Sequence, residues 1–159
     1  DDAVVRAAVR RMGTLNATAA AVAIDHGIKG GTDVTGFGLL GHLRVLARAS
    51  LVSAEIDVSA VPILEGAAEL VEAGHVPGGT RRNLDDVRSD VDFHTSISAV
   101  RRTLLADAQT SGGLLLCVGP DRVDEVVEEL RAGGVDEAAV IGRLVGGDPG
   151  RIRVIPGTD

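Results

Sequence analysis

Aromatic residues are nearly missing from this chain, which has two phenylalanines and neither tyrosine nor tryptophan in 159 residues. Because hydrophobic residues still make up 45% of it, the core must be built from valine, leucine, isoleucine and alanine. A single cysteine excludes an internal disulfide. No apolar run approaches the roughly 20 residues of a membrane-spanning helix, and no signal-peptide pattern opens the chain. We therefore expect a cytoplasmic location and no membrane partner.

An excess of basic residues is missing as well. Sixteen lysines and arginines stand against 23 aspartates and glutamates, which gives a net charge of −7. Because nucleic-acid backbones and anionic membranes attract basic surfaces, this balance argues against a nucleic-acid partner. A length of 159 residues is enough for one domain with a substantial core, and we expect a single domain over residues 1–159.

The chain also lacks an initiating methionine. Its only methionine is Met12, and Asp1 already lies inside a helical pattern of apolar residues. We therefore expect this sequence to be a piece of a longer protein.

The order of helical and extended patterns predicts an α+β or three-layer α/β/α fold, a mixed β-sheet flanked by helices rather than a doubly wound parallel sheet. Glycine and proline mark most of the expected boundaries. We expect helices over residues 2–25 (kinked or split at Gly13 and Asn16), 37–49, 64–73 and 96–106 and from Pro120 to Gly133, and strands over 28–33, 52–58, 114–118, 138–145 and 151–155.

Three details of this pattern are specific enough to test. The helix over residues 37–49 should turn Leu40, Leu43, Val45 and Leu46 inward. Residues 75–92 form the longest stretch expected to be irregular, and long loops in compact domains are usually functional or disordered. Residues 146–150, rich in glycine, are expected to be a hairpin turn between the last two strands.

Residues 30–38 are the most informative stretch of the chain. They place one carboxylate, Asp33, between the hydroxyls of Thr32 and Thr35 in a run of four glycines that lets a ligand approach the backbone. One interpretation is a Mg²⁺ ligand facing nucleotide phosphates near a helix N-terminus. The other is that Asp33 or Thr35 simply caps the following helix. The stretch is neither a P-loop nor a dinucleotide fingerprint.

Other candidate residues have weaker patterns. Residues 78–83 could hold an anion or a partner loop, or form a solvated turn. Asp107 or Thr110 could serve a ligand, although a tight turn into a strand explains residues 107–113 equally well. The histidines at positions 26, 42, 75 and 94 have no metal-ligand spacing, and Cys117, in an apolar run, is expected to be a small core residue.

Four separated blocks resemble the signature of selenophosphate synthetase (selenide, water dikinase), a family within the AIR synthetase-related superfamily. They cover nearly the whole chain, but only the C-terminal half of the family's members. Met12 with residues 14–16 also fits the helix that opens that half. The four blocks are residues 32–43, 53–56, 76–80 with Asn83, and 107–115.

The resemblance implies an ATP-dependent phosphotransferase that converts ATP, selenide and water into selenophosphate, AMP and phosphate. It further implies Mg²⁺ and possibly K⁺ as cofactors, ATP bound between two domains, and homodimerisation through the N-terminal domain. That ATP-binding and catalytic domain is absent here, so we expect the isolated chain to be inactive. The alternatives are another ATP-dependent synthetase or kinase of the superfamily, or a noncatalytic ATP-binding or interaction module.

The resemblance assigns few site residues to this half. Asp33 matches the family's C-terminal metal-binding aspartate. No catalytic residue is expected in this chain, because the nucleophilic cysteine or selenocysteine and its lysine should lie upstream. The positions that the resemblance places near ATP or its phosphates are Thr32, Thr35, Gly36, Gly38, Thr80 and Asn83.

Overall fold

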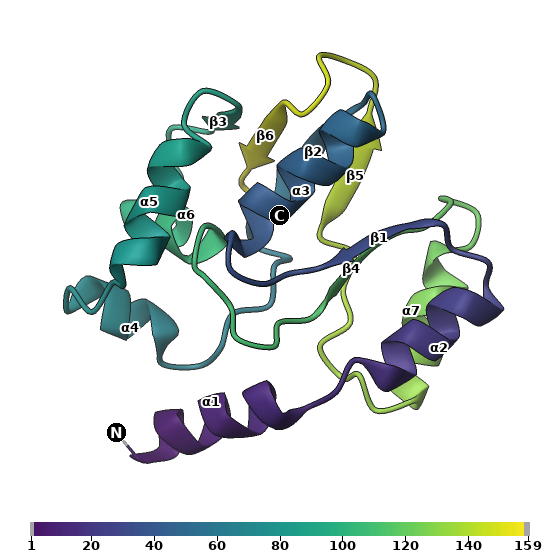
Figure 1. The fold of residues 1–159 in the computed structure, drawn as a ribbon, viewed down its shortest axis with the longest axis horizontal. Helices are drawn as coiled ribbons and strands as arrows, with labels where there is room; N and C mark the ends of the chain where they lie inside the picture. The colour runs from purple at the N-terminus through teal and green to yellow at the C-terminus, as the bar shows by residue number, and fades with distance from the viewer. Residues whose placement is uncertain (1, 158–159) are drawn as a thin grey trace.

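The computed structural model describes residues 2–157 and contains helices, a sheet and a separate strand ribbon (Figure 1). The helices are α1 (Asp2–Gly13), α2 (Ala17–Asp25), α3 (Gly38–Ala49), α4 (Ala67–Glu72), α5 (Gly78–Asp86), α6 (Ala99–Leu105) and α7 (Val123–Ala132). The strands are β1 (Gly30–Asp33), β2 (Ser53–Asp57), β3 (Val91–Phe93), β4 (Leu114–Cys117), β5 (Gly142–Val145) and β6 (Ile152–Ile155).

Four of the strands form a mixed sheet in the order β3-β6-β2-β5. Strand β6 lies parallel to both β3 and β2, whereas β5 runs antiparallel to β2. The expected α+β class with a mixed sheet flanked by helices is therefore confirmed. A second pair, β1 and β4, forms an antiparallel ribbon of its own, which the sequence pattern did not predict.

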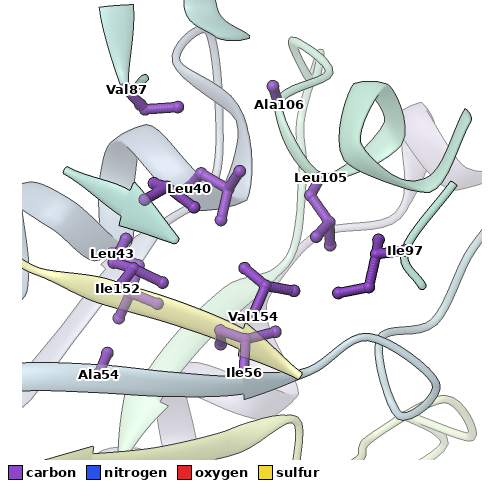
Figure 2. Close-up of a cluster of buried hydrophobic side chains, with 11 residues drawn as sticks. Leu40, Leu43, Ala54, Ile56, Val87, Ile97, Leu105, Ala106, Ile152 and Val154 are labelled. Carbon is purple, nitrogen blue, oxygen red and sulfur yellow. The ribbon is translucent and has the colours of Figure 1, made fainter. Parts of the chain in front are cut away.

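One face of the sheet carries the main core. Ile56 of β2 and Val154 of β6 are register partners and project from the same face, where they meet Leu40 of α3 and Leu105 of α6 (Figure 2). Val87, at the end of α5, joins the same cluster. As the composition predicts, the cluster is aliphatic, and only the half-buried Phe93 brings an aromatic ring to its edge.

The opposite face of the sheet carries a row of charges. Cross-strand register places Asp92, Arg153, Glu55 and Arg143 side by side across all four strands. Glu55 is 5% exposed and forms ion pairs with Arg153 and, at 2.7 Å, with Arg143. The hydrogen bond from Arg153 and the one from Arg143 hold the pKa of the Glu55 carboxyl below its usual value of 4.5, against the opposing effect of burial.

The ribbon links this core to a second, smaller one. Leu115 of β4 packs against the main core, while Val118 just after β4 packs against Val22 of α2 and Val126 of α7. Figure 1 shows α2 and α7 side by side at this end of the molecule. The ribbon therefore has α3 on one side and the α2–α7 pair on the other, and this arrangement fixes the place of β1.

The expectation that residues 75–92 are irregular was wrong. They contain helix α5 and strand β3. Two glycines at its start give α5 a poor intrinsic propensity, but Thr80, Leu84 and Val87 recur at helical spacing and face the interior, where Thr80 and Val87 are each 1% exposed. Tertiary burial therefore outweighs local preference.

The expected hairpin at residues 146–150 was also wrong. Strands β5 and β6 exist, but β2 lies between them, so they do not pair. The loop passes around the start of β2 instead. There the amide of Gly150 donates to the Val52 carbonyl at 2.9 Å, and the Ser53 hydroxyl donates to the Asp148 carbonyl at 2.7 Å.

The first helical pattern splits between α1 and α2, as Gly13 and Asn16 indicated. Helix α1 buries none of its residues, and Val5 and Val9 on it are more than half exposed. In α3 the inward prediction holds for Leu40 and Leu43 but fails for Val45, which is 61% exposed. Within residues 2–157, no helix is both long and apolar enough to cross a membrane.

Candidate functional site

Asp33 is the last residue of β1 and lies opposite Leu114 of β4. It is exposed, and within the described residues its carboxylate has no hydrogen-bond or ion-pair partner. The capping interpretation of this loop is wrong, because α3 begins after Phe37 with no side-chain cap. Instead, the Thr35 carbonyl accepts a 3.0 Å hydrogen bond from the Gly38 amide. The Asp33 carboxylate is therefore free to meet a ligand.

Thr35 is held by a histidine from the helix that follows it. The Thr35 amide donates to Nε2 of His42 at 3.0 Å, and the Thr35 hydroxyl lies 3.2 Å from the same nitrogen. The His42 ring also contacts Phe37, with ring centroids 5.7 Å apart. From the sequence, His42 was considered only for metal-ligand spacing, and this contact was missed. Its spacing of seven residues from Thr35, across a helix start, is the only signal in the sequence.

The two glycines that follow Thr35 have different roles. Gly38 has a φ of +67°, and a Cβ atom there would lie 2.6 Å from the Ala106 carbonyl, so only glycine fits. A Cβ atom on Gly36 would meet nothing within 4 Å. The Gly36 carbonyl instead accepts a 2.9 Å hydrogen bond from the side-chain amide of Asn83.

Helix α5 therefore supports the loop. The Asn83 amide bridges two segments, because it also donates to the Ala106 carbonyl at 3.1 Å. One turn earlier, the buried hydroxyl of Thr80 donates to the carboxylate of Asp107. Asn83 thus contacts the Asp33 loop directly, and Thr80 contacts the segment after α6. Both use their polar groups on the protein itself, and their place near ATP stays a prediction.

Residues 107–113 complete the support from a third segment. The backbone amide of Gln109 donates to the Thr35 carbonyl at 3.0 Å, and the backbone amide of Val34 donates to the Gly113 carbonyl at 2.9 Å.

Gly112 in the same segment packs closely against the loop. A Cβ atom there would clash with the Val34 carbonyl, and the side-chain amide of Asn16 donates to the Gly112 carbonyl at 2.8 Å. Three of the four sequence blocks therefore meet at one loop.

Some candidate residues take no part in this network. The Thr32 hydroxyl donates to the carbonyl of Asp33, so it braces only its own neighbour. Arg81 and Arg82 are exposed on α5, in agreement with a solvated surface, and Thr110 is exposed as well.

The family comparison covers nearly the whole chain. The sequence profile of the family described as "AIR synthase related protein, C-terminal domain" matches residues 2–155. The chain belongs to this family. The loop, helix α5 and the turn before β4 all lie inside the matched range, so the site described above is part of the family's domain.

Similar curated proteins share one name. A selenide, water dikinase of Paraburkholderia xenovorans is 43% identical over 141 residues, which is 89% of this chain and 40% of the relative. The enzyme of that name from Clostridioides difficile is 44% identical over 72% of this chain and 33% of its own length. The one from Pseudomonas straminea is 42% identical over 94% of this chain and 42% of its own length. The chain therefore spans about two fifths of the length of most of these relatives.

A solved structure supports the fold. The thiamine-monophosphate kinase of Stenotrophomonas maltophilia K279a superposes with a TM-score of 0.50 at 19% identity, covering 80% of this chain and 31% of the kinase chain. At this identity the likeness concerns the fold alone.

The family's domain here supplies few metal ligands by itself. Across residues 2–157, no group of three or more histidine, cysteine, aspartate or glutamate side chains is arranged to hold a metal ion. Cys117 pairs with Gly30 at the far end of the ribbon from Asp33. It is half-buried rather than fully buried, and burial raises the pKa of its thiol, which makes it a poor nucleophile at neutral pH.

Proposed function

We propose that this chain is the C-terminal domain of a selenide, water dikinase, which makes selenophosphate, AMP and phosphate from selenide, ATP and water. The observation that carries the proposal is an identity of 42–44% to proteins of that name over 72–94% of the chain. The family match over residues 2–155 includes the Asp33 loop and the two segments that support it. The activity itself belongs to the whole protein, of which the chain covers the smaller part.

In this proposal Asp33 is one Mg²⁺ ligand. Mg²⁺ keeps several waters in proteins and is usually held by one or two carboxylates together with substrate phosphates. A single exposed carboxylate that has no partner among residues 2–157, on a loop held by neighbouring segments, fits such a role. Mg²⁺ would offset the charge of the ATP phosphates, and the chain's own contribution is to hold the Asp33 loop in place.

The remaining ligands and the nucleophile would come from the preceding domain. A carboxylate delivered by a second domain completes the site only when the two domains close around ATP, which excludes water until substrate is bound. We extend the proposal to K⁺ as a second cation, to homodimerisation through that preceding domain, and to a cytoplasmic location. Thr32, Thr35, Gly36 and Gly38 would shape the loop near the phosphates, while Thr80 and Asn83 support it.

The test is an assay of the full-length protein with ATP and Mg²⁺, with and without selenide. Phosphorus NMR should show selenophosphate, AMP and phosphate formed in equal amounts only when selenide is present. ATP consumption that ignores selenide but depends on another acceptor would favour a different synthetase or kinase of the superfamily. If the folded full-length protein binds ATP but does not consume it with any acceptor, a noncatalytic module is the better description.

A further inference from the structure

We propose that His42 is a positioning residue that fixes the Asp33 loop and turns the Thr35 hydroxyl into a hydrogen-bond acceptor for a cation or its bound water. This inference rests on the proposed function, since it assigns a task within the same site. His42 acts through Thr35 and is not itself placed on the ligand.

His42 accepts a hydrogen bond from the backbone of Thr35. The Thr35 amide can only donate, and its nitrogen lies 3.0 Å from Nε2 of His42. Nε2 must therefore carry a lone pair, so the ring is neutral and its proton is on Nδ1. Without this acceptor, the Thr35 amide would lose its hydrogen-bond partner within the described residues.

The Thr35 hydroxyl contacts the same ring nitrogen. Its oxygen lies 3.2 Å from the same nitrogen, which has no hydrogen to give. A hydrogen bond in this contact can therefore only be donated by the hydroxyl, which shares the single lone pair of Nε2 with the Thr35 amide. The oxygen is left with lone pairs alone, and these suit a cation or the hydrogens of metal-bound water rather than a phosphate oxygen.

The helix that carries His42 is firmly packed on the core. His42 lies on α3 between two buried residues, Gly41 and Leu43. Leu40, two positions before His42, is fully buried against the sheet. The helix therefore cannot shift easily relative to the core, and the ring is further placed by its contact with Phe37. Groups that orient a metal site in this way typically change metal affinity or activity by about 10–100-fold when removed.

The experiment compares variants of the full-length protein. His42→Phe keeps a ring but removes the acceptor, whereas His42→Gln offers a carbonyl oxygen at similar reach. His75→Phe, at an exposed position outside the site, is the matched control. The readouts are turnover and the Mg²⁺ concentration that gives half-maximal activity.

We expect His42→Phe to raise the half-maximal Mg²⁺ concentration by about tenfold or more, His42→Gln to recover most of this loss, and His75→Phe to match the unmodified protein. Equal Mg²⁺ dependence of His42→Phe and the unmodified protein would overturn the proposal. Equal losses in His42→Phe and His42→Gln would overturn it too, because the acceptor would then be irrelevant. An Asp33→Asn variant with normal turnover would count against the proposed metal role itself, whatever His42 does.

A second measurement needs no variant. In the unmodified full-length protein, hydrogen exchange followed by NMR should show a protected Thr35 amide. The Gly36 amide, which has no hydrogen-bond partner among residues 2–157, should exchange freely. Equally fast exchange at both amides would show that Nε2 does not hold Thr35 and would overturn the inference, even if the His42→Phe protein failed to fold.

Discussion

The side-chain amide of Asn83 donates a 2.9 Å hydrogen bond to the carbonyl of Gly36, across 47 residues of sequence. The same amide reaches the Ala106 carbonyl at 3.1 Å. One side chain on α5 therefore ties the Asp33 loop to the segment that precedes β4. The position of the loop thus depends on contacts that are distant in the chain.

Asn83→Ala should lower the free energy of unfolding by about 1–3 kcal/mol, because two carbonyl groups lose their donor. The gain in helix propensity from alanine works in the opposite direction and is smaller. Urea unfolding of this chain measures the difference. Arg82→Ala, the adjacent exposed position on α5, should stay within about 0.5 kcal/mol. Equal effects of the two variants would show that Asn83 does not brace the loop.

Gly38 and Gly36 form a matched pair. Gly38→Ala should cost about 1–3 kcal/mol from its left-handed backbone alone, and the clash of the new Cβ with the Ala106 carbonyl adds to this. Gly36→Ala has open space and no left-handed φ, so it should be nearly neutral. Thermal unfolding of both variants checks the order, and a Gly36→Ala variant as unstable as Gly38→Ala would contradict it.

Glu55 makes stability depend on pH. Because the pKa of this carboxyl is lower in the folded chain than its usual 4.5, the folded state holds the charged form more firmly than the unfolded state does. The contribution of the Glu55 carboxylate to the free energy of unfolding is fully present above pH 4.5. It is lost as the pH falls further toward the folded pKa.

Glu55→Gln should therefore reduce the stability lost between neutral pH and about pH 3, as measured by urea unfolding at each pH. Glu65→Gln, at an exposed position, provides the comparison. If Glu55→Gln lost as much stability on acidification as the unmodified chain, the ion pairs with Arg143 and Arg153 would not be the cause.

The isolated chain should bind Mg-ATP weakly or not at all. It offers one free carboxylate at the site, and residues 2–157 contain no cluster of three potential metal ligands. Isothermal titration calorimetry of this chain with Mg-ATP should show no saturable heat at micromolar concentrations. Micromolar binding would mean that the site does not need a second domain.

The sequence predicted the strong local patterns well. The break in the first helix at Gly13, the helix over residues 37–49 and the apolar strand that contains Cys117 each depend on neighbouring residues, and the structure confirms them. The sequence-based predictions failed where contacts between distant segments determine the secondary structure or the strand pairing. Helix α5 forms because Thr80 and Val87 are buried, and β6 pairs with β2 rather than β5 although a glycine-rich turn precedes it.

The candidate site shows the same division. Asp33 was proposed from its glycine-rich surroundings, since loop composition is a local signal, and its metal role stays a prediction. The roles of His42, Asn83 and Gln109 depend on three segments meeting in space, which spacing alone does not reveal. The resemblance marked the block around Asn83 but not its role, because a sequence pattern cannot separate a ligand contact from a structural hydrogen bond.

The most direct test of the central claim is the turnover of full-length Asp33→Asn, measured as selenide-dependent AMP formation and compared with Asp25→Asn, another exposed aspartate. A metal contributes several kcal/mol of charge stabilisation, and each 1.4 kcal/mol is about tenfold in rate. We therefore predict that Asp33→Asn loses about 100-fold or more of its turnover with little change in unfolding temperature, while Asp25→Asn stays normal. Near-normal turnover of Asp33→Asn would contradict the proposed metal role of Asp33.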